Sequence, residues 1–459
     1  MLFKQFITKG LGCYSYVVGC PLAGVMAVVD PRRDIGVYLE TAQEYEMQIT
    51  HIFETHIHAD HVSGAQELKA STGADIYIHE SAPVGYSAVK LNEGDEFLLG
   101  NTAMRVLHTP GHTPNSVSFL ISDLTRSPEP GVILTGDLLF VGDIGRPDLP
   151  GDEILDEQVE NLHNSLYNTL KKLPDYLEVY PAHGEGSLCG QGMSAKPSST
   201  LGYERMTNPM LNYTDFSAFR QTVLSHLPMR PQSFESIIQT NLTGADIPVK
   251  RDPREYALSV EKTIELQKDG AKILDLRDSL SYGAAHIPGS VNVDFTNGPR
   301  LNWVGMVLPP GSAIVLVLTS DSDFDKIRLE LQRIGYDDVK GRLQGGIAAW
   351  LGSGSETQSL KHISATVLNA QLAETDPPAL IDVRTPEEFA GASIKGAVNL
   401  PIDRILGMDS CPVDLNEEVV VVCQSGFRAG IAAGVLQAKG CEKLSVLSGG
   451  MIAWSSRKR

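Results

Sequence analysis

The chain has 459 residues, 42% of them hydrophobic and 20% charged, so it is long enough for about three compact domains and too apolar to be disordered. Its 38 Lys and Arg residues are outnumbered by 56 Asp and Glu residues, and the formal net charge of −18 argues against a nucleic-acid or anionic-membrane surface. Six scattered cysteines, no secretory leader pattern and no apolar run of bilayer length predict a cytoplasmic protein without a disulfide framework.

The first part of the chain is predicted to be a layered α/β domain over residues 1–245. Short β-rich apolar runs, among them GVMAVVD, ADIYIHE, VSFLI and GVILTGD, alternate with turn-rich loops. The segment 186–216 is rich in Gly, Ser, Pro and Asn, which predicts a long loop that packs on this domain or leads out of it.

Five histidines and two aspartates of this domain follow or end apolar runs, where strands give way to loops. They are His56, His58, Asp60 and His61 in THIHADH, His112 in TPGHTPNS, Asp137 in LTGDLLF and His183 in YPAHG. Imidazole nitrogens and carboxylate oxygens are ligands that divalent iron, zinc and manganese accept. A set of this size therefore indicates a metal centre.

The order and spacing of these residues resemble the metallo-β-lactamase superfamily, specifically its glyoxalase II and persulfide dioxygenase branch, over about half of the chain. The resemblance implies an αββα sandwich whose loops hold the metal at one edge of the two sheets. In persulfide dioxygenases one Fe(II) is bound by the residues that match His56, His112 and Asp137. The remaining four, His58, Asp60, His61 and His183, would then surround this triad. In glyoxalase II enzymes all seven positions bind two metals, so the ligand set alone leaves zinc open.

Two features favour the dioxygenase: a turn motif, and the place of the rhodanese-like repeats, which stand where glyoxalase II enzymes carry a helical glutathione-binding domain. The run VGDIGRPDL at 141–149 resembles a turn of persulfide dioxygenases, in which Arg146 and Asp148 would form a structural ion pair beside the site. The run GEGSLCG at 184–190 resembles bacterial fusions of persulfide dioxygenase and rhodanese, and this resemblance implies that Cys189 carries or receives a sulfane sulfur near the iron. The alternative for Cys189 is a small apolar side chain that fills a loop. Cys20 is predicted to be a thiol in the core or at a strand end.

The rest of the chain is an internal repeat. KILDLRDSLSYGAAHIPGSVNV at 272–293 matches ALIDVRTPEEFAGASIKGAVNL at 379–400, and RLQGGIAAW at 342–350 matches VLSGGMIAW at 446–454. Two similar α/β domains of about a hundred residues are therefore predicted, over 246–356 and 357–459.

The last domain carries a reactive cysteine. The apolar run EEVVVV leads into Cys423 and then through small residues to Arg428 and a helix start, so backbone amides and the helix dipole converge on the sulfur and stabilise a thiolate. Four residues separate Cys423 from Arg428, one fewer than in a phosphate-binding loop of the Cys-x5-Arg type. The stretch 362–456 resembles rhodanese sulfurtransferases, which implies that Cys423 is the nucleophile, that Arg428 and the loop amides bind the anion, and that Asp382 and Arg384 form a structural pair.

The middle domain differs at the decisive position. Thr319 stands where the repeat places Cys423, and Asp321, Asp323 and Asp325 follow it. Without a thiolate, and with acidic side chains that repel an anionic sulfur donor, this domain is predicted to be an inactive rhodanese-like domain for spacing, docking or oligomer contact.

These features together predict an enzyme that oxidises low-molecular-weight persulfides to sulfite with O2 and one Fe(II) per chain, coupled to sulfur transfer through Cys423 that makes or uses thiosulfate. The expected partners are a thiol persulfide, O2 and sulfite or thiosulfate, with no nucleic acid and no membrane, in a homo-oligomer. A binuclear zinc thioester hydrolase and a non-oxidising sulfur carrier remain alternatives. The carrier thiol and the direction of sulfur transfer stay open.

Overall fold

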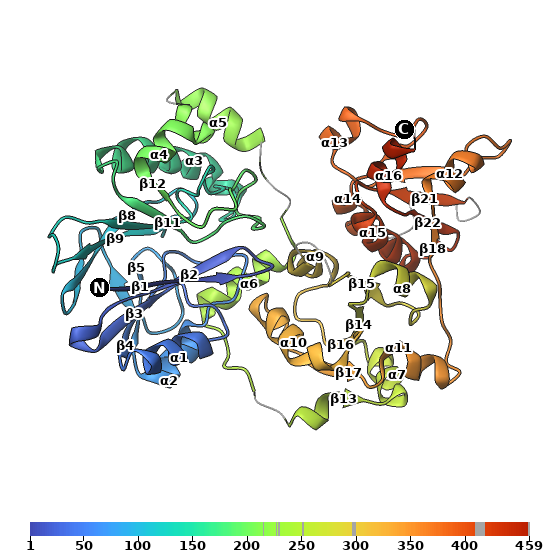
Figure 1. The fold of residues 1–459 in the computed structure, drawn as a ribbon, viewed down its shortest axis with the longest axis horizontal. Helices are drawn as coiled ribbons and strands as arrows, with labels where there is room; N and C mark the ends of the chain where they lie inside the picture. Colours follow the sequence, from blue (N-terminus) through green and yellow to red (C-terminus); the bar gives the residue numbers. More distant parts are fainter. Residues whose placement is uncertain are drawn as a thin grey trace. The chain divides into compact units, whose positions relative to one another are not determined.

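The computed structural model describes residues 1–213, 215–225, 227, 230–249, 252–295, 300–408 and 418–457. The chain divides into two compact units, one of Met1–Val249 with Leu329–Gly335, the other of Lys250–Arg328 with Tyr336–Arg459. Figure 1 shows the chain up to Val249 in blue to yellow-green and the residues after it in yellow to red.

The first unit contains two six-stranded sheets among its described residues, with strand orders β1-β2-β3-β4-β5-β6 and β12-β11-β10-β9-β8-β7. The first sheet consists of β1 (Leu2–Thr8), β2 (Cys13–Cys20), β3 (Val25–Val29), β4 (Gln48–Phe53), β5 (Asp75–His79) and β6 (Val89–Leu91). The second consists of β7 (Glu96–Leu99), β8 (Thr102–His108), β9 (Val117–Asp123), β10 (Val132–Gly136), β11 (Glu178–Pro181) and β12 (Ser199–Thr200).

Helices cover the outer faces of both sheets, and the main core lies between the sheets. Phe53 on β4 and Phe119 on β9 are fully buried there, with ring centroids 5.2 Å apart. Tyr38 and Leu68 pack helices onto the outer face of the first sheet, and Leu162 packs a helix onto the second. The helices of this unit are α1 (Gly36–Glu44), α2 (Ala65–Thr72), α3 (Leu155–Asn164), α4 (Leu201–Thr207), α5 (Phe216–Ser225) and α6 (Ser233–Thr243). Figure 1 shows α1 and α2 on one side and α3 to α5 on the other, which confirms the predicted αββα sandwich.

The segment 186–216 was predicted as a long loop, and this prediction is wrong for its second half. The structure has β12 at 199–200 and then α4, whose first residue Leu201 is buried. The helix begins there because the Thr200 hydroxyl accepts a hydrogen bond from the backbone N–H of Tyr203, which caps the helix N-terminus. The loop proper is the stretch before Ser199, where Gly, Ser and Pro are densest.

The second unit contains two five-stranded parallel sheets in its described part, with the same strand arrangement in each. The orders are β13-β17-β16-β14-β15 and β18-β22-β21-β19-β20. The strands of the first are β13 (Ala257–Leu258), β14 (Lys272–Asp275), β15 (Val291–Asn292), β16 (Ile314–Val317) and β17 (Val339–Leu343). Those of the second are β18 (Lys361–Ile363), β19 (Ala379–Asp382), β20 (Val398–Asn399), β21 (Val419–Val422) and β22 (Leu444–Leu447). The two repeats thus form two α/β folds of equal topology, as predicted.

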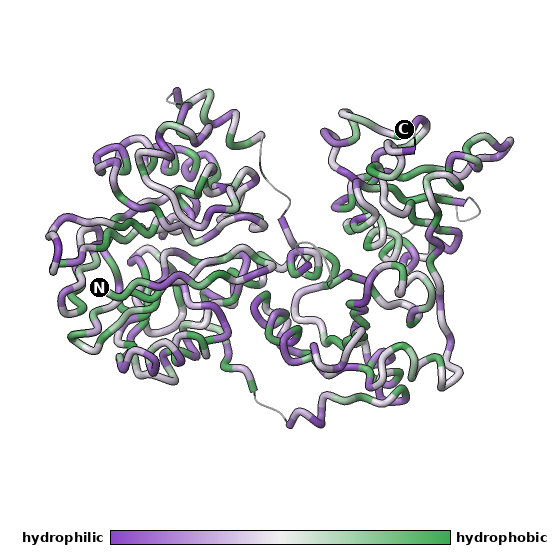
Figure 2. The backbone as a smooth tube through the Cα atoms, in the orientation of Figure 1, coloured by the Kyte–Doolittle hydropathy of each residue, from purple (hydrophilic) through white to green (hydrophobic). Residues whose placement is uncertain are grey.

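Helices alternate with these strands, as parallel connections require. They are α7 (Val260–Lys268), α8 (Ser279–Ala284), α9 (Arg300–Val307), α10 (Phe324–Arg333), α11 (Gly346–Gly352), α12 (Ala365–Gln371), α13 (Pro386–Gly391), α14 (Ile402–Leu406), α15 (Phe427–Ala438) and α16 (Gly450–Ser456). Strand β21 reads VVVV and is wholly buried, and in Figure 2 it lies in a green hydrophobic stretch. None of the helices in the described ranges combines the length and the apolar character that a membrane crossing requires.

Candidate functional site

The predicted metal ligands lie on loops that follow strands. The loop that carries His56, His58, Asp60 and His61 follows β4, and His112, Asp137 and His183 come after β8, β10 and β11. The first of these loops is braced by Asn241 on α6. The Asn241 side-chain amide donates to the carbonyls of His58 (2.8 Å) and His61 (2.9 Å) and accepts from the Ser63 N–H (2.9 Å). The end of the first domain therefore fixes the loop that opens the site.

His56, His112 and Asp137 form one buried group. Their ligand atoms all lie within 4.8 Å of one another. Asp137 Oδ2 is 3.7 Å from His56 Nε2 and 3.3 Å from His112 Nε2. Each of the three residues is at most 1% exposed.

Hydrogen bonds fix which atoms of this triad can face a metal. His112 Nδ1 donates to the Arg146 carbonyl (2.7 Å), and His183 Nδ1 donates to Asp137 Oδ1 (2.5 Å). His112 Nε2 and Asp137 Oδ2 are left without a hydrogen-bond partner in the described part of the chain. A buried polar atom without a hydrogen-bond partner destabilises the fold. These two atoms lie 3.3 Å apart, so one ion could contact both. The triad therefore fits a metal ion.

The third ligand, His56, is oriented by a chain of hydrogen bonds that begins at Asp30, the residue directly after β3. Asp30 Oδ2 accepts from the Thr55 hydroxyl (2.8 Å), so the Thr55 oxygen accepts from Nδ1–H of His56 (2.9 Å) and His56 Nε2 is free of a proton. Burial lowers the pKa of His56 and His112, which keeps both imidazoles neutral. Burial raises the pKa of Asp137, but His183 and His112 outweigh it and hold that pKa below its ordinary value. Two neutral imidazoles and one carboxylate result.

His183 lies between two carboxylates beside the triad. Besides Asp137, it contacts Asp60 Oδ2 through Nε2 (2.8 Å). Asp60 also contacts His61 Nδ1 (3.1 Å) and accepts from the Cys13 thiol (3.0 Å). Burial lowers the pKa of His183, but Asp137 and Asp60 outweigh burial and raise it well above its ordinary value. The ligand atoms of Cys13, Asp60, His61 and His183 lie within 4.8 Å of one another, so this group could hold a second metal.

His58 belongs to a separate acidic group. Its Nε2 is 3.1 Å from Asp30 Oδ1 and 3.4 Å from Glu54 Oε2. Burial alone lowers the pKa of His58, but Asp30 and Glu54 raise it to about 10. His58 is thus a buried cation held by two carboxylates, although its ring centroid is only 4.1 Å from that of His56.

Sequence reasoning missed Cys13, Asp30, Glu54 and Asn241. A signal was present for two of them, because Asp30 and Glu54 each end an apolar run, GVMAVVD and ITHIFE, as several of the recognised residues do. Cys20, predicted as a core or strand-end thiol, is buried at the last position of β2.

The predicted ion pair of Arg146 and Asp148 is confirmed. Arg146 Nε and Nη2 donate to the two Asp148 oxygens at 2.6 and 2.7 Å. Arg146 Nη1 also donates to the Leu188 carbonyl (3.1 Å), and its backbone N–H donates to the carbonyl of Cys189 (3.2 Å). This arginine therefore joins the loop that positions His112 to the loop that carries Cys189.

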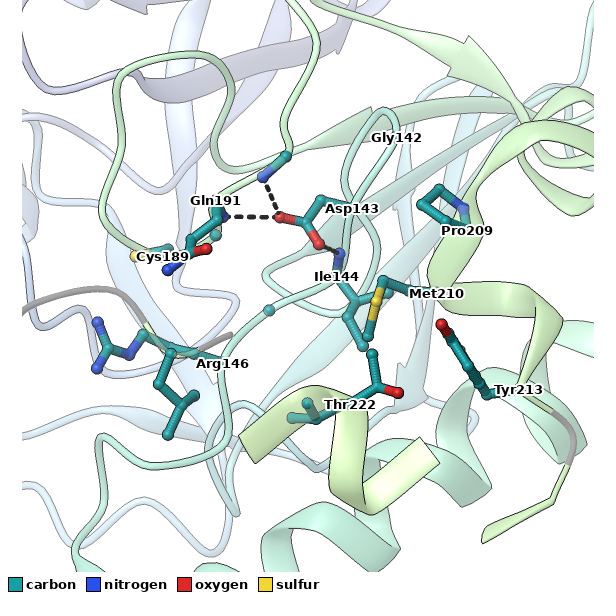
Figure 3. Close-up of a pocket in the computed structure, with 15 residues that line it drawn as sticks. Gly142, Asp143, Ile144, Arg146, Cys189, Gln191, Pro209, Met210, Tyr213 and Thr222 are labelled. Carbon is teal, nitrogen blue, oxygen red and sulfur yellow. Dashed lines mark hydrogen bonds between the residues drawn. The ribbon is translucent and has the colours of Figure 1, made fainter. Parts of the chain in front are cut away.

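Cys189 is buried between the metal-ligand group and a cavity of about 370 Å³ (Figure 3). Its sulfur and the ligand atoms of Asp137 and His183 lie within 4.8 Å of one another. Burial raises the pKa of Cys189 to about 12, so its side chain is a thiol at neutral pH. The cavity is lined by two loops, residues 142–146 and 189–192, and by the apolar side chains of Met210, Tyr213, Val223 and Leu227.

Asp143 ties the two loops of the cavity together. Its carboxylate accepts backbone N–H bonds from Ile144 (2.9 Å), Gln191 (2.8 Å) and Gly192 (2.8 Å), drawn as dashed lines in Figure 3. Backbone N–H groups of the two loops that line the cavity therefore stabilise the Asp143 carboxylate.

In the last domain, Cys423 follows β21 and opens the loop that leads into α15. The thiol is buried, and Sγ accepts the N–H of Gly426 at 3.1 Å. Gly426 has φ +100°, a conformation that disfavours any residue with a Cβ, and it lets the loop close around the sulfur. The pair of Asp382 and Arg384 is confirmed, with distances of 2.9 and 2.7 Å. Arg428 forms a bidentate pair with Glu388, which the sequence reading did not identify.

The middle domain keeps the scaffold of this site without the thiol. Arg277 pairs with Asp275 at 2.9 and 2.6 Å, as Arg384 does with Asp382 in the last domain. Leu318 directly follows β16, as Cys423 follows β21, because Val317 and Val422 pair with the equivalent residues Asp275 and Asp382. The predicted equivalent of Cys423, Thr319, therefore lies one residue further along the chain, and neither residue supplies a thiol. Trp303 on α9 contacts the ring of Phe427 in the Cys423 loop, with centroids 6.2 Å apart. The middle domain therefore supplies a neighbour to the loop of the last domain.

Two family models match the chain. The metallo-β-lactamase superfamily model matches residues 31–183, and the rhodanese-like domain model matches residues 259–353 and 364–457. The solved structure of a metallo-β-lactamase from Staphylococcus aureus subsp. aureus COL is 32% identical with a TM-score of 0.68, and the match covers 75% of this chain and 99% of that chain.

Two further proteins are similar to the first domain. A hydroxyacylglutathione hydrolase of Methylococcus capsulatus is 33% identical over 172 residues, 37% of this chain and 61% of the relative. The structure of ETHE1 from Myxococcus xanthus is 26% identical with a TM-score of 0.46, and the match covers 52% of this chain and 98% of that chain. The chain belongs to the metallo-β-lactamase superfamily, and two rhodanese-like domains follow its metallo-β-lactamase domain.

Proposed function

We propose that the protein oxidises low-molecular-weight persulfides with O2 at a single Fe(II) ion held by His56, His112 and Asp137. The observation that carries this proposal is the triad itself, with His112 Nε2 and Asp137 Oδ2 unpartnered and the other atoms of both side chains engaged. Two imidazoles and one carboxylate are the ligand set of non-haem Fe(II) oxygenases. His58 Nε2 lies 3.1 Å from Asp30 Oδ1 and 3.4 Å from Glu54 Oε2, outside the triad, so we assign the iron to His56, His112 and Asp137 alone.

The proposed oxidation is balanced as RSSH + O2 + H2O giving RSH, SO3²⁻ and two protons. A bound iron would supply the open coordination positions and the redox chemistry that let O2 react with sulfur. The carbonyl of Arg146 orients His112, and His183 orients Asp137. The cavity beside Cys189 would receive the organic part of the persulfide, with the neutral Cys189 thiol next to the reacting sulfur.

In the same proposal Cys423 transfers sulfane sulfur. Its thiolate attacks the outer sulfur of RSSH, the S–S bond breaks, and RS⁻ leaves as a persulfide forms on Cys423. Sulfite then attacks that outer sulfur and leaves as thiosulfate, which restores the thiol. No external oxidant is needed, and the reverse order would use thiosulfate. Domains over 1–245, 246–356 and 357–459 would place both reactions in one chain and raise the effective concentration of sulfite.

A binuclear zinc thioester hydrolase is the second candidate. It is favoured by the group of Cys13, Asp60, His61 and His183 beside the triad and by the similarity to a hydroxyacylglutathione hydrolase. A third candidate is a sulfur carrier in which Cys423 and Cys189 relay persulfide without oxidation.

Oxygen uptake and metal content distinguish these candidates. Glutathione persulfide or coenzyme A persulfide is added to the full chain, O2 is followed with an electrode, and iron and zinc are measured in the same sample. Uptake with about one iron per chain is the expected result. Hydrolysis of a glutathione thioester with two zincs per chain and no uptake would replace the proposal by the hydrolase, and persulfide transfer without uptake would replace it by the carrier.

A further inference from the structure

Arg428, the cation of the Cys423 loop, is already paired within the chain. Its Nη1 donates to Glu388 Oε2 at 2.8 Å and its Nη2 donates to Glu388 Oε1 at 2.7 Å. The Arg428 and Glu388 side chains are only 22% and 34% exposed. Bidentate pairing of this kind is the geometry in which a guanidinium binds an oxyanion. Glu388 therefore occupies the donors that an anionic sulfur donor would use.

Glu388 is held in this position by its own helix. It is the third residue of α13 and completes a capping box, in which the Thr385 hydroxyl accepts the Glu388 N–H (3.3 Å) and Glu388 Oε2 accepts the Thr385 N–H (3.1 Å). The bond from Arg428 lowers the pKa of Glu388, so the carboxylate is charged at neutral pH.

The other arginine near the loop is also engaged. Arg384 donates Nε and Nη2 to Asp382, Nη2 also to the Ala392 carbonyl (2.6 Å), and Nη1 to the Gln424 side chain (3.3 Å). An anion that approaches Cys423 therefore meets two arginines whose charges are both balanced by carboxylates.

We infer that Glu388 is a specificity-determining residue of the Cys423 site: by pairing with Arg428 it disfavours small dianions such as thiosulfate and favours organic persulfides as sulfur donors. This inference rests on the proposed sulfur-transfer function of Cys423. Thiosulfate must displace the Glu388 carboxylate before it can use Arg428, whereas a persulfide can react through its outer sulfur and the loop amides alone. The pair also eases the release of thiosulfate once it forms.

The test compares Glu388→Gln with Glu387→Gln in the full chain. Glutamine can still accept the Thr385 N–H, so the capping box survives while the charge is lost. Glu387 is the exposed neighbour on the same turn and provides the matched control. Iodoacetate and iodoacetamide alkylate the same thiol and differ by one charge. The ratio of their alkylation rates at Cys423, measured by peptide mass spectrometry, therefore reports the electrostatic potential at the sulfur. The burial of the thiol slows both reagents and drops out of this ratio.

In Glu388→Gln the ratio of the iodoacetate rate to the iodoacetamide rate should rise about threefold, because the negative charge beside the site is lost. KM for thiosulfate should fall about tenfold, because the same change in potential acts on two charges of thiosulfate and on one charge of iodoacetate. Glu387→Gln should match the wild-type protein in both. An unchanged ratio in Glu388→Gln overturns the inference, and so does an equal fall of both alkylation rates, which would make Glu388 only a brace of the loop. If Cys423 is alkylated with the predicted ratios but accepts sulfur from none of the donors, the proposed sulfur-transfer function is refuted instead.

Discussion

Asp30→Asn should weaken metal binding although Asp30 is not a ligand of the triad. In the native protein the Asp30 carboxylate accepts the Thr55 hydroxyl proton, so the Thr55 oxygen accepts from His56 Nδ1–H and leaves His56 Nε2 free to bind a metal. An asparagine amide nitrogen in place of Oδ2 would instead donate to Thr55. The Thr55 hydroxyl would then donate to His56 Nδ1, and the ring proton would move to Nε2, the metal-facing nitrogen.

The size of the effect follows from this change of tautomer. Loss of a hydrogen-bond partner that orients a metal ligand typically lowers metal affinity about 10- to 100-fold. We therefore expect the dissociation constant of Fe(II) to rise by that factor, measured under anaerobic conditions by competition with a chelator. The substituted side chain can still accept the Thr55 N–H through Oδ1 (2.7 Å), but the change also removes one of the two carboxylates beside His58. The free energy of unfolding of the variant is therefore measured alongside its iron affinity.

Asp75→Asn is the matched control, because Asp75 is 59% exposed and pairs with Lys69 on the surface. It should leave the dissociation constant within about twofold of the wild-type value. Equal iron affinity in Asp30→Asn and Asp75→Asn would refute the argument that Asp30 sets the tautomer of His56.

Three further predictions concern sulfur transfer, stability and pH. Cys423→Ser should abolish sulfur transfer from thiosulfate and keep O2 uptake with added persulfide, and loss of both activities would contradict the division of labour. Asp382→Asn, which leaves the buried Arg384 without its charge partner, should lower the free energy of unfolding in urea by about 3–5 kcal/mol. Asp252→Asn, at an exposed pair, should leave the free energy of unfolding at the wild-type value. Because the pKa of His58 is raised to about 10 in the folded chain, its contribution to stability is complete below its ordinary pKa of 6.5 and is lost as pH rises toward 10. Thermal unfolding of the wild-type protein and His58→Gln between pH 6 and 10 should show this loss in the wild type only.

The fold was predictable from the sequence because the patterns that indicate it are either short apolar runs or motifs that occur twice in the chain. Apolar runs gave the strands of the sandwich, and the match of 272–293 with 379–400 predicted two α/β domains of one topology, which β14 and β19 confirm by their equal places in the two sheets. The prediction for 186–216 failed where one capping residue, Thr200, outweighs a Gly- and Pro-rich composition.

The residues of the candidate site could be selected from sequence, but their partners could not. Asp30 and Thr55 are 25 residues apart, and Arg428 and Glu388 are 40 apart, so only the tertiary fold brings each pair together. His58 was predicted to surround the triad or to bind a second metal, and the structure places it beside Asp30 and Glu54, which the sequence did not single out. A motif gives the types of ligand, and the hydrogen bonds around each ring decide which nitrogen faces the metal.

The three N–H bonds to Asp143 have a consequence for ligand recognition. They join residues of both loops that line the cavity beside Cys189, so the walls are ordered before any ligand arrives. A ligand then avoids the conformational entropy cost of ordering the loops, which is about 0.5–1.5 kcal/mol for each side chain immobilised on binding. A rigid cavity selects among carrier thiols by shape, so persulfides of different thiols should differ more in KM than a flexible cavity would allow.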